Sequence, residues 1–131
     1  MNELLNLDLS GETLREMAEI NPDIMDLSSD EVKEKIEILK LLGCRDNQVL
    51  NIISSNPLYL SRLNSDVVSL ISYLNEVGFT CLRILFDSNP YILNLDVFEV
   101  RDYIDGRIKN GETLEDIVDD LDSNTYLFNE M

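Results

Sequence analysis

Apolar residues recur along this chain at intervals of three and four positions, the spacing that gathers them on one face of an α-helix. Val32, Ile36 and Leu39 show this spacing directly after Ser28-Ser29-Asp30-Glu31. Such a start is a capping box, in which a serine oxygen accepts hydrogen bonds from the free amides of the first turn. The same pattern returns twice further along the chain. Three long amphipathic helices are therefore predicted, and no strand.

Proline and glycine divide these helices into a repeat. Each of the three prolines follows an asparagine, and a fourth copy has Thr125 in the proline's place, with steps of 35, 33 and 35 residues between copies. Fixed distances after the proline positions hold a large apolar residue, a valine, an isoleucine and a glycine. The sets, prolines first, are Pro22, Pro57 and Pro90; Met25, Leu60, Leu93 and Phe128; Val32, Val67 and Val100; Ile36, Ile71 and Ile104; Gly43, Gly78 and Gly111. Agreement at this many positions predicts a helical-repeat protein with a unit of about 34 residues.

Each unit is predicted to hold two α-helices and a short 3₁₀ turn. Proline has no N–H to donate and ends the shorter helix, whereas glycine ends the long helix by adopting a positive φ at no steric cost. Asp46 is expected to cap the first of the shorter helices, and the other two are expected to begin after Thr80 and Thr113. The valines and isoleucines of the repeat should be buried between neighbouring units. One helical-repeat domain is expected over residues 1–131, with units at about 11–43, 44–78 and 79–111 and a partial repeat at 112–131.

The charge of the chain is strongly negative and unevenly spread. The net charge is −16, and residues 1–37 and 96–131 each carry 11 acidic and 3 basic side chains, whereas residues 38–95 carry 4 of each. A negative field of this size repels phosphate backbones and anionic lipid surfaces, and it speeds the capture of basic proteins. We therefore expect an acidic binding protein with a protein partner, a basic one fitting best, and with no membrane partner.

The residue types exclude many kinds of active site. Histidine is absent, which rules out an imidazole base and any histidine-containing zinc site. Cys44 and Cys81 are too few for a four-cysteine zinc site and are expected to be small buried thiols. Asp119, Asp120 and Asp122 resemble the start of a calcium loop but lack its glycine, so a solvated helix end is expected. No catalytic residue, cofactor-binding residue or metal ligand is assigned, and an enzyme is not expected.

The sequence also bears on location. Residues 1–12 are acidic, unlike the basic start of a secretion signal or an arginine-rich transit peptide. No apolar run approaches the roughly 18 residues that would span a bilayer. A cytoplasmic location is expected.

One pattern of glycine, proline and apolar positions appears twice. It extends from Leu42-Gly43 through Ile52-Ile53 and Pro57 to Ile71, and it recurs from Gly78 through Pro90 to Ile104. This pattern resembles the repeat of the mitochondrial transcription termination factor (mTERF) family, over roughly residues 11–128. The resemblance implies a solenoid of stacked three-helix units, a surface that binds double-stranded DNA or RNA in transcription or RNA metabolism, and no enzymatic activity.

Two functions stay open. Four bases in the neutral middle segment are candidate contacts for nucleic acid or a partner: Lys40, Arg45, Arg62 and Arg83. The same segment holds as many acids, so ordinary surface pairs are the favoured interpretation of these bases. Tyr59, Tyr91 and Tyr126 follow the proline positions and could stack on bases, but packing against the repeat is favoured. We favour a non-enzymatic, acidic protein-binding scaffold, with nucleic-acid binding as the alternative.

Overall fold

The computed structural model describes residues 9–131, and this part of the chain contains helices and no strand. The first eight residues of the predicted domain lie outside it. The chain divides into two compact units, one ending at Asn64 and the other spanning Ser65–Met131. The all-α, helical-repeat fold class predicted from the sequence is confirmed, while the exact boundaries of the repeat units stay a prediction.

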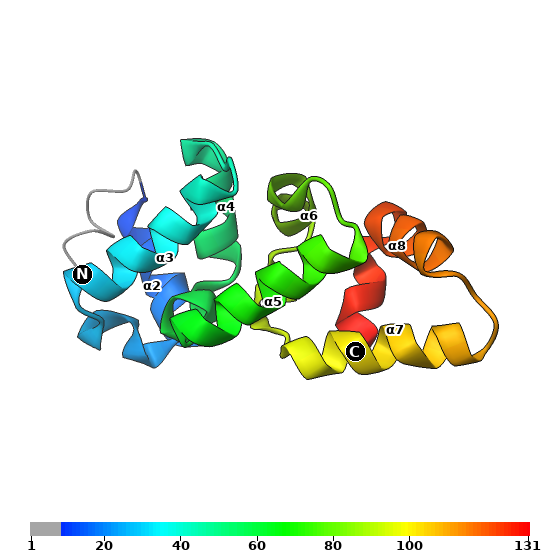
Figure 1. The fold of residues 1–131 in the computed structure, drawn as a ribbon. Coiled ribbons are helices and arrows are strands. Elements are labelled where there is room, and N and C mark those ends of the chain that lie inside the picture. Colours follow the sequence, from blue (N-terminus) through cyan, green and yellow to red (C-terminus); the bar gives the residue numbers. More distant parts are fainter. Residues whose placement is uncertain (1–8) are drawn as a thin grey trace. The chain divides into compact units, whose positions relative to one another are not determined.

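The described part of the first unit has one α-helix and a 3₁₀ helix, followed by two α-helices and a second 3₁₀ helix (Figure 1). In chain order its elements are α2 (Gly11–Ile20), η1 (Pro22–Asp26), α3 (Ser29–Leu41), α4 (Asp46–Ser55) and η2 (Pro57–Ser61). Both 3₁₀ helices begin at a proline that follows an asparagine, as the sequence predicted. Ser28 caps α3 by accepting a hydrogen bond from the Glu31 amide at 3.1 Å.

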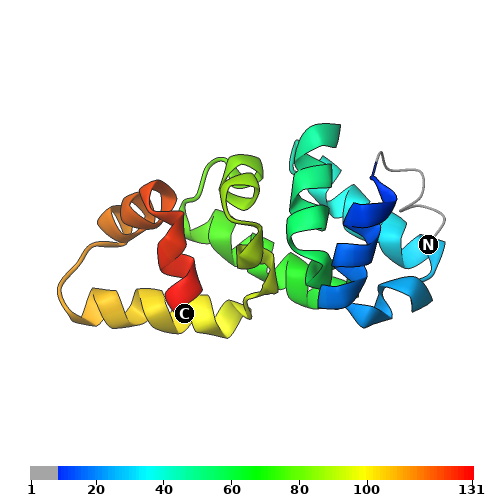
Figure 2. The same ribbon diagram turned by 180° about the vertical axis from the view of Figure 1, so that it is seen from behind.

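The second unit contains the order of two α-helices followed by a 3₁₀ helix twice (Figure 2). Its elements are α5, which spans Asn64–Val77 and so begins at the last residue of the first unit, α6 (Leu82–Ser88), η3 (Pro90–Asn94), α7 (Val97–Lys109), α8 (Leu114–Ser123) and η4 (Thr125–Glu130). Asp96 caps α7 and Thr113 caps α8, each through its side-chain oxygen. Thr125, which stands in the place of the proline in the fourth copy, also starts a 3₁₀ helix.

Glycine ends the three long helices in the same way. Gly43, Gly78 and Gly111 have φ values of 94°, 117° and 96°, the positive values that were predicted. At each end the glycine amide donates to the carbonyl three residues back, and the next amide donates to the carbonyl five residues back. This pair of bonds is the Schellman motif, which glycine enters without steric strain.

A pair of side chains accompanies each of these helix ends. Each pair consists of the residue that follows the glycine and the residue five positions earlier, whose carbonyl accepts a hydrogen bond from the amide of the first. The first two pairs are Leu39 with Cys44 and Leu74 with Phe79, all four buried. In the third copy the pair is Arg107 and Glu112, joined by hydrogen bonds of 2.8 Å and 2.6 Å from the guanidinium to the two carboxylate oxygens. An ion pair thus replaces the apolar contact that normally accompanies the motif.

The asparagine before a proline position links two 3₁₀ helices of the same unit. Asn21 is buried, and its Nδ2 donates to the Pro57 carbonyl at 3.0 Å and to Ser61 Oγ at 2.8 Å. Asn89 does the same in the second unit, donating to the Thr125 carbonyl and to Asn129 Oδ1, both at 2.9 Å. In both cases the partners are the next proline position and the residue four further on. The asparagine of the motif therefore has a structural task.

Two of the six positions predicted to be buried are only half-buried, so that part of the prediction was wrong. The four buried positions are Val32, Val67, Val100 and Ile104. Ile36 and Ile71 are half-buried, and the residues directly before them, Lys35 and Leu70, take the buried place. The reason is helical geometry, since the buried stripe of α3 and α5 continues three and seven residues after the valine.

Two local predictions also change. Asp46 does not cap α4 but is its first residue, because Arg45 occupies the cap and donates its amide to Gln48 Oε1 at 2.9 Å. Of the tyrosines, Tyr59 is fully buried, whereas Tyr91 and Tyr126 are exposed. Tyr59 stands two residues after its proline position and the other two stand one residue after theirs, which turns them to the outside of the 3₁₀ helix.

Candidate binding surfaces

The four bases singled out from the sequence are divided between the two units. Lys40 at the end of α3 lies 3.7 Å from Asp46 Oδ1, and both side chains are largely exposed. Arg45 begins α4, and Arg62 follows η2 and is half-buried. These three belong to the first unit, whereas Arg83 lies on α6 in the second.

Arg62 lines a pocket of about 470 Å³ in the first unit, where acids outnumber bases. Two cations, Arg62 and Lys35, share this lining with Asp23, Glu31 and Glu34. The Lys35 ammonium is buried and donates a hydrogen bond to Asn64 Oδ1. Burial lowers the pKa of Lys35, and the neighbouring glutamates oppose that shift. The surroundings of Arg62 therefore do not form a positive path.

A groove runs between α5 and α7 in the second unit. Its central part encloses about 430 Å³, and a smaller hollow of about 140 Å³ continues it, sharing Ser69, Val97 and Phe98 with the central part. We call the two together the α5–α7 groove. Its lining residues are Asp66, Val68, Ser69, Ser72, Tyr73 and Glu76 from α5, and Asp96, Val97, Phe98 and Arg101 from the start of α7. Small serines on α5 leave space that larger apolar side chains border.

Aromatic rings hold an arginine inside this groove. The Arg101 guanidinium carbon lies 5.1 Å from the centre of the Tyr73 ring and 5.6 Å from the centre of the Phe98 ring. Both distances fit cation–π contacts. Phe98 is 62% exposed and Val68 is 50% exposed. Burial raises the pKa of Tyr73, and the negative charge of Asp105 adds to that shift. The groove thus combines an exposed apolar wall, a stacked cation and nearby carboxylates.

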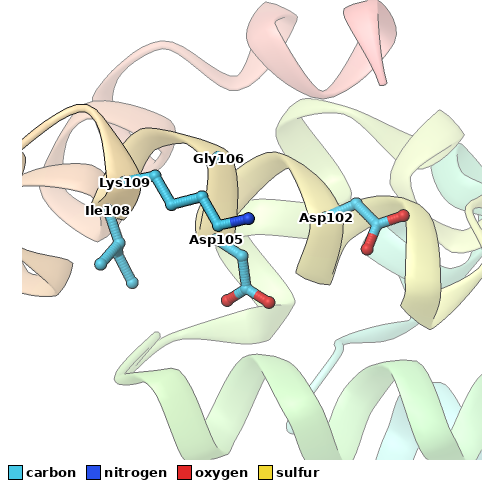
Figure 3. Close-up of a pocket in the computed structure, with 5 residues that line it drawn as sticks. All are labelled: Asp102, Asp105, Gly106, Ile108 and Lys109. Carbon is cyan, nitrogen blue, oxygen red and sulfur yellow. The ribbon is translucent and has the colours of Figure 1, made fainter.

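A second hollow of about 500 Å³ lies further along α7, where Gly106 leaves space (Figure 3). Its lining consists of Asp102, Asp105, Gly106, Ile108 and Lys109. The Asp105 and Ile108 side chains project from the same side of the helix, and the Lys109 side chain extends back along the helix towards Asp105 (Figure 3). Taken together, the groove and this hollow carry five carboxylates and two cations. This face of α7 is therefore acidic along its length.

The apolar residues on this face are not required by the repeat. Val97, Phe98 and Ile108 lie 7, 8 and 18 residues after Pro90. The same positions of the two earlier copies hold polar residues, namely Ser29 and Asn64, Asp30 and Ser65, and Lys40 and Asn75. Sequence reasoning missed these three residues because it looked for agreement between copies. An apolar residue where the other copies are polar is the signal that would have found them.

The acidic run that resembled a calcium loop lies in α8, and one of its members, Asp120, pairs with Arg107. Asp120 accepts a hydrogen bond from Asn124 at 2.9 Å, and its other carboxylate oxygen lies 2.9 Å from the Arg107 guanidinium. These contacts lower the pKa of Asp120, and the hydrogen bonds from Arg107 lower the pKa of Glu112. Asp120 therefore has a structural role, in which it links Arg107 of α7 to α8.

Neither Cys44, which is buried, nor Cys81, which is half-buried, forms a disulfide. Within residues 9–131, no single helix is long and apolar enough to cross a membrane. The segments Asn64–Val77 and Leu82–Ser88 reach that length and composition only when joined across a bend of 116°.

The repeated order of α-helix, Schellman glycine, α-helix and 3₁₀ helix agrees with the resemblance found in the sequence. The family pattern named mTERF matches residues 1–120 of the chain. This chain belongs to the mTERF family. No curated protein and no solved structure matches it at a significant level. Membership in the mTERF family identifies it as a helical-repeat protein of a non-enzymatic family that is associated with binding nucleic acid.

Proposed function

We propose that this mTERF-family chain is a non-enzymatic binding module that holds a protein partner through the α5–α7 groove. The observation that carries this proposal is the set of exposed apolar side chains around the stacked Arg101. Aromatic residues and arginine are the residue types that dominate the binding energy of protein interfaces. Phe98 and Tyr73 also hold the arginine in a fixed position, which reduces the entropy lost on binding.

The positions of the basic residues support a protein ligand over a nucleic acid. Binding to a phosphate backbone needs several cations on one surface, because the release of counterions supplies most of the affinity. Lys40 is close to Asp46, and Arg62 shares its pocket with three acids. In the second unit, 14 acidic side chains oppose 4 basic ones, a net charge of −10. This unit has the wrong sign for a phosphate backbone.

Nucleic-acid binding is the second candidate, and family membership is the observation that favours it. Equilibrium binding of the chain to fluorescently labelled DNA and RNA duplexes distinguishes the protein-binding candidate from the nucleic-acid-binding candidate. We expect a dissociation constant above about 10⁻⁴ M at 0.15 M salt, weaker than the usual non-specific binding of basic proteins. Micromolar binding with a steep salt dependence, lost in the Arg62→Ala and Arg83→Ala variants, would establish nucleic acid as the ligand instead.

The protein-binding proposal is tested by co-purification from the source cell, with and without nuclease treatment. We expect specific partner proteins that survive the nuclease and that are lost in a Phe98→Ala variant. Tyr126→Ala is a matched control, because Tyr126 lies in the same unit and is 62% exposed, as Phe98 is. Partners that disappear on nuclease treatment, or that bind the Phe98→Ala variant as well as the unchanged chain, would contradict the proposal.

A further inference from the structure

The face of α7 that borders the α5–α7 groove has the pattern of a surface that receives a helix. Phe98, Arg101, Asp105 and Ile108 follow one another at intervals of three, four and three residues, so they form one stripe along α7. The stripe from Phe98 to Ile108 is about 15 Å long, which matches about three turns of a partner helix. Grooves between helices commonly bind amphipathic helices in this way.

The apolar residues on this stripe define what the partner must present. Val68, Val97 and Phe98 border the groove at the start of α7, and Ile108 borders the hollow near its end. Phe98 and Ile108 are 62% and 43% exposed. A partner helix with apolar residues at intervals of three and four positions would cover these side chains along its whole length.

The charges on this face define the polar side of the partner. Asp66 and Asp96 lie at one end of the groove, Glu76 lies beside its centre, and Asp102 and Asp105 continue along α7. Arg101 and Lys109 are the two cations among these lining residues, and the stacked Arg101 is partly covered by aromatic rings. A partner with lysines or arginines beside its apolar stripe is attracted by this surface, whereas an acidic partner is repelled.

We propose that the α5–α7 groove binds a basic amphipathic helix of a partner protein, with Phe98 as its central apolar contact and the surrounding carboxylates pairing with its cations. This inference rests on the proposed function, because it names the chemistry of the partner for the same groove. It also gives a role to the strong negative charge of the second unit, which the repeat fold itself does not require.

The test uses the full chain and three synthetic 14-residue peptides labelled with a fluorophore. The first is a helix of leucine and lysine with leucines at helical spacing. The second has the same composition in an order without amphipathic spacing, and the third has glutamate in place of lysine. Binding is measured by fluorescence anisotropy at low and at physiological salt. We expect the first peptide to bind at least tenfold more tightly than the other two, and less tightly at higher salt.

Variants of the chain then locate the site. Phe98→Ala should weaken binding of the first peptide about tenfold, as removal of a central interface contact does, and Tyr126→Ala should leave it unchanged. The pair Asp66→Asn and Glu76→Gln should reduce both the affinity and its salt dependence. The matched pair Glu115→Gln and Asp119→Asn removes the same charge from exposed positions of α8 and should have a smaller effect.

Equal binding of the three peptides, or no effect of the Phe98→Ala and Asp66→Asn changes, would overturn this inference. The proposed function fails separately. If co-purified proteins depend on Phe98 but present an acidic or an uncharged segment, the groove is still a protein-binding site and the basic helix is the wrong partner. If no protein depends on Phe98, both proposals are wrong.

Discussion

Replacing Asn21 by alanine tests whether the Asn-Pro motif stabilises the fold through its side chain. Asn21 is 2% exposed and donates two hydrogen bonds, one to the Pro57 carbonyl and one to Ser61 Oγ. Each bond contributes about 0.5–1.5 kcal/mol, and the buried Pro57 carbonyl would lose a partner. We therefore expect Asn21→Ala to lower the free energy of unfolding by about 1–3 kcal/mol.

The second unit supplies an internal comparison for this measurement. Asn89 makes the equivalent two bonds but is only half-buried, and its partner Asn129 is exposed. Water can replace the lost donor there, so Asn89→Ala should cost about 1 kcal/mol or less. Asn21→Asp separates hydrogen bonding from packing, because it keeps the shape of the side chain but replaces the donor by an anion beside the Pro57 carbonyl. It should destabilise at least as much as alanine does.

Urea unfolding followed by the helical circular dichroism signal measures these differences, provided the slope of free energy against urea stays constant. Asn47→Ala, at an exposed position of α4, controls for a general effect of removing an asparagine. A loss below about 0.5 kcal/mol for Asn21→Ala would refute the reasoning, since it is within the range of ordinary surface substitutions. So would an Asn21→Asp variant as stable as the unchanged chain.

Three further changes test other parts of the fold. Gly78→Ala should destabilise the chain by about 1 kcal/mol or more, because φ at this position is 117°; thermal unfolding would show the change, and a gain in stability would contradict it. Leu70→Ala, at a fully buried position, should lower the free energy of unfolding by about 2–5 kcal/mol, and Ile71→Ala should lower it distinctly less. Urea unfolding measures both, and equal losses would mean that α5 turns a different face inward. Arg107→Leu should reduce the loss of stability at acid pH, because Arg107 lowers the pKa of Glu112 and of Asp120. In the unchanged chain these two carboxylates stabilise the fold above their usual pKa values, and that stabilisation is lost as the pH falls. Free energies of unfolding measured from pH 7 to pH 3 would show a shallower slope in the variant, and an unchanged slope would exclude this role.

The proline and glycine positions that the copies share were predicted well from the sequence, because each follows from backbone geometry. Proline fixes φ and has no N–H to donate, whereas glycine adopts a positive φ without steric cost, so Pro57 starts a 3₁₀ helix and Gly78 ends α5. The choice between Ile71 and Leu70 as the buried residue was predicted wrongly, because the two differ by one position on the helix. Both are apolar, and the rotation of α5 depends on the packing of neighbouring helices rather than on the pattern alone.

The candidate site was missed for the opposite reason, since it lies where the copies differ. Arg107 and Glu112 show that a departure from the repeat can be structural, because together they replace an apolar pair at the end of α7. Phe98 contacts Arg101 but stays 62% exposed, Ile108 is also exposed, and both have polar counterparts in the other copies. Leaving large apolar side chains in water stabilises nothing within the described fold. A departure that is compensated inside the chain therefore points to the fold, and one that is not points outward, to a ligand that covers it.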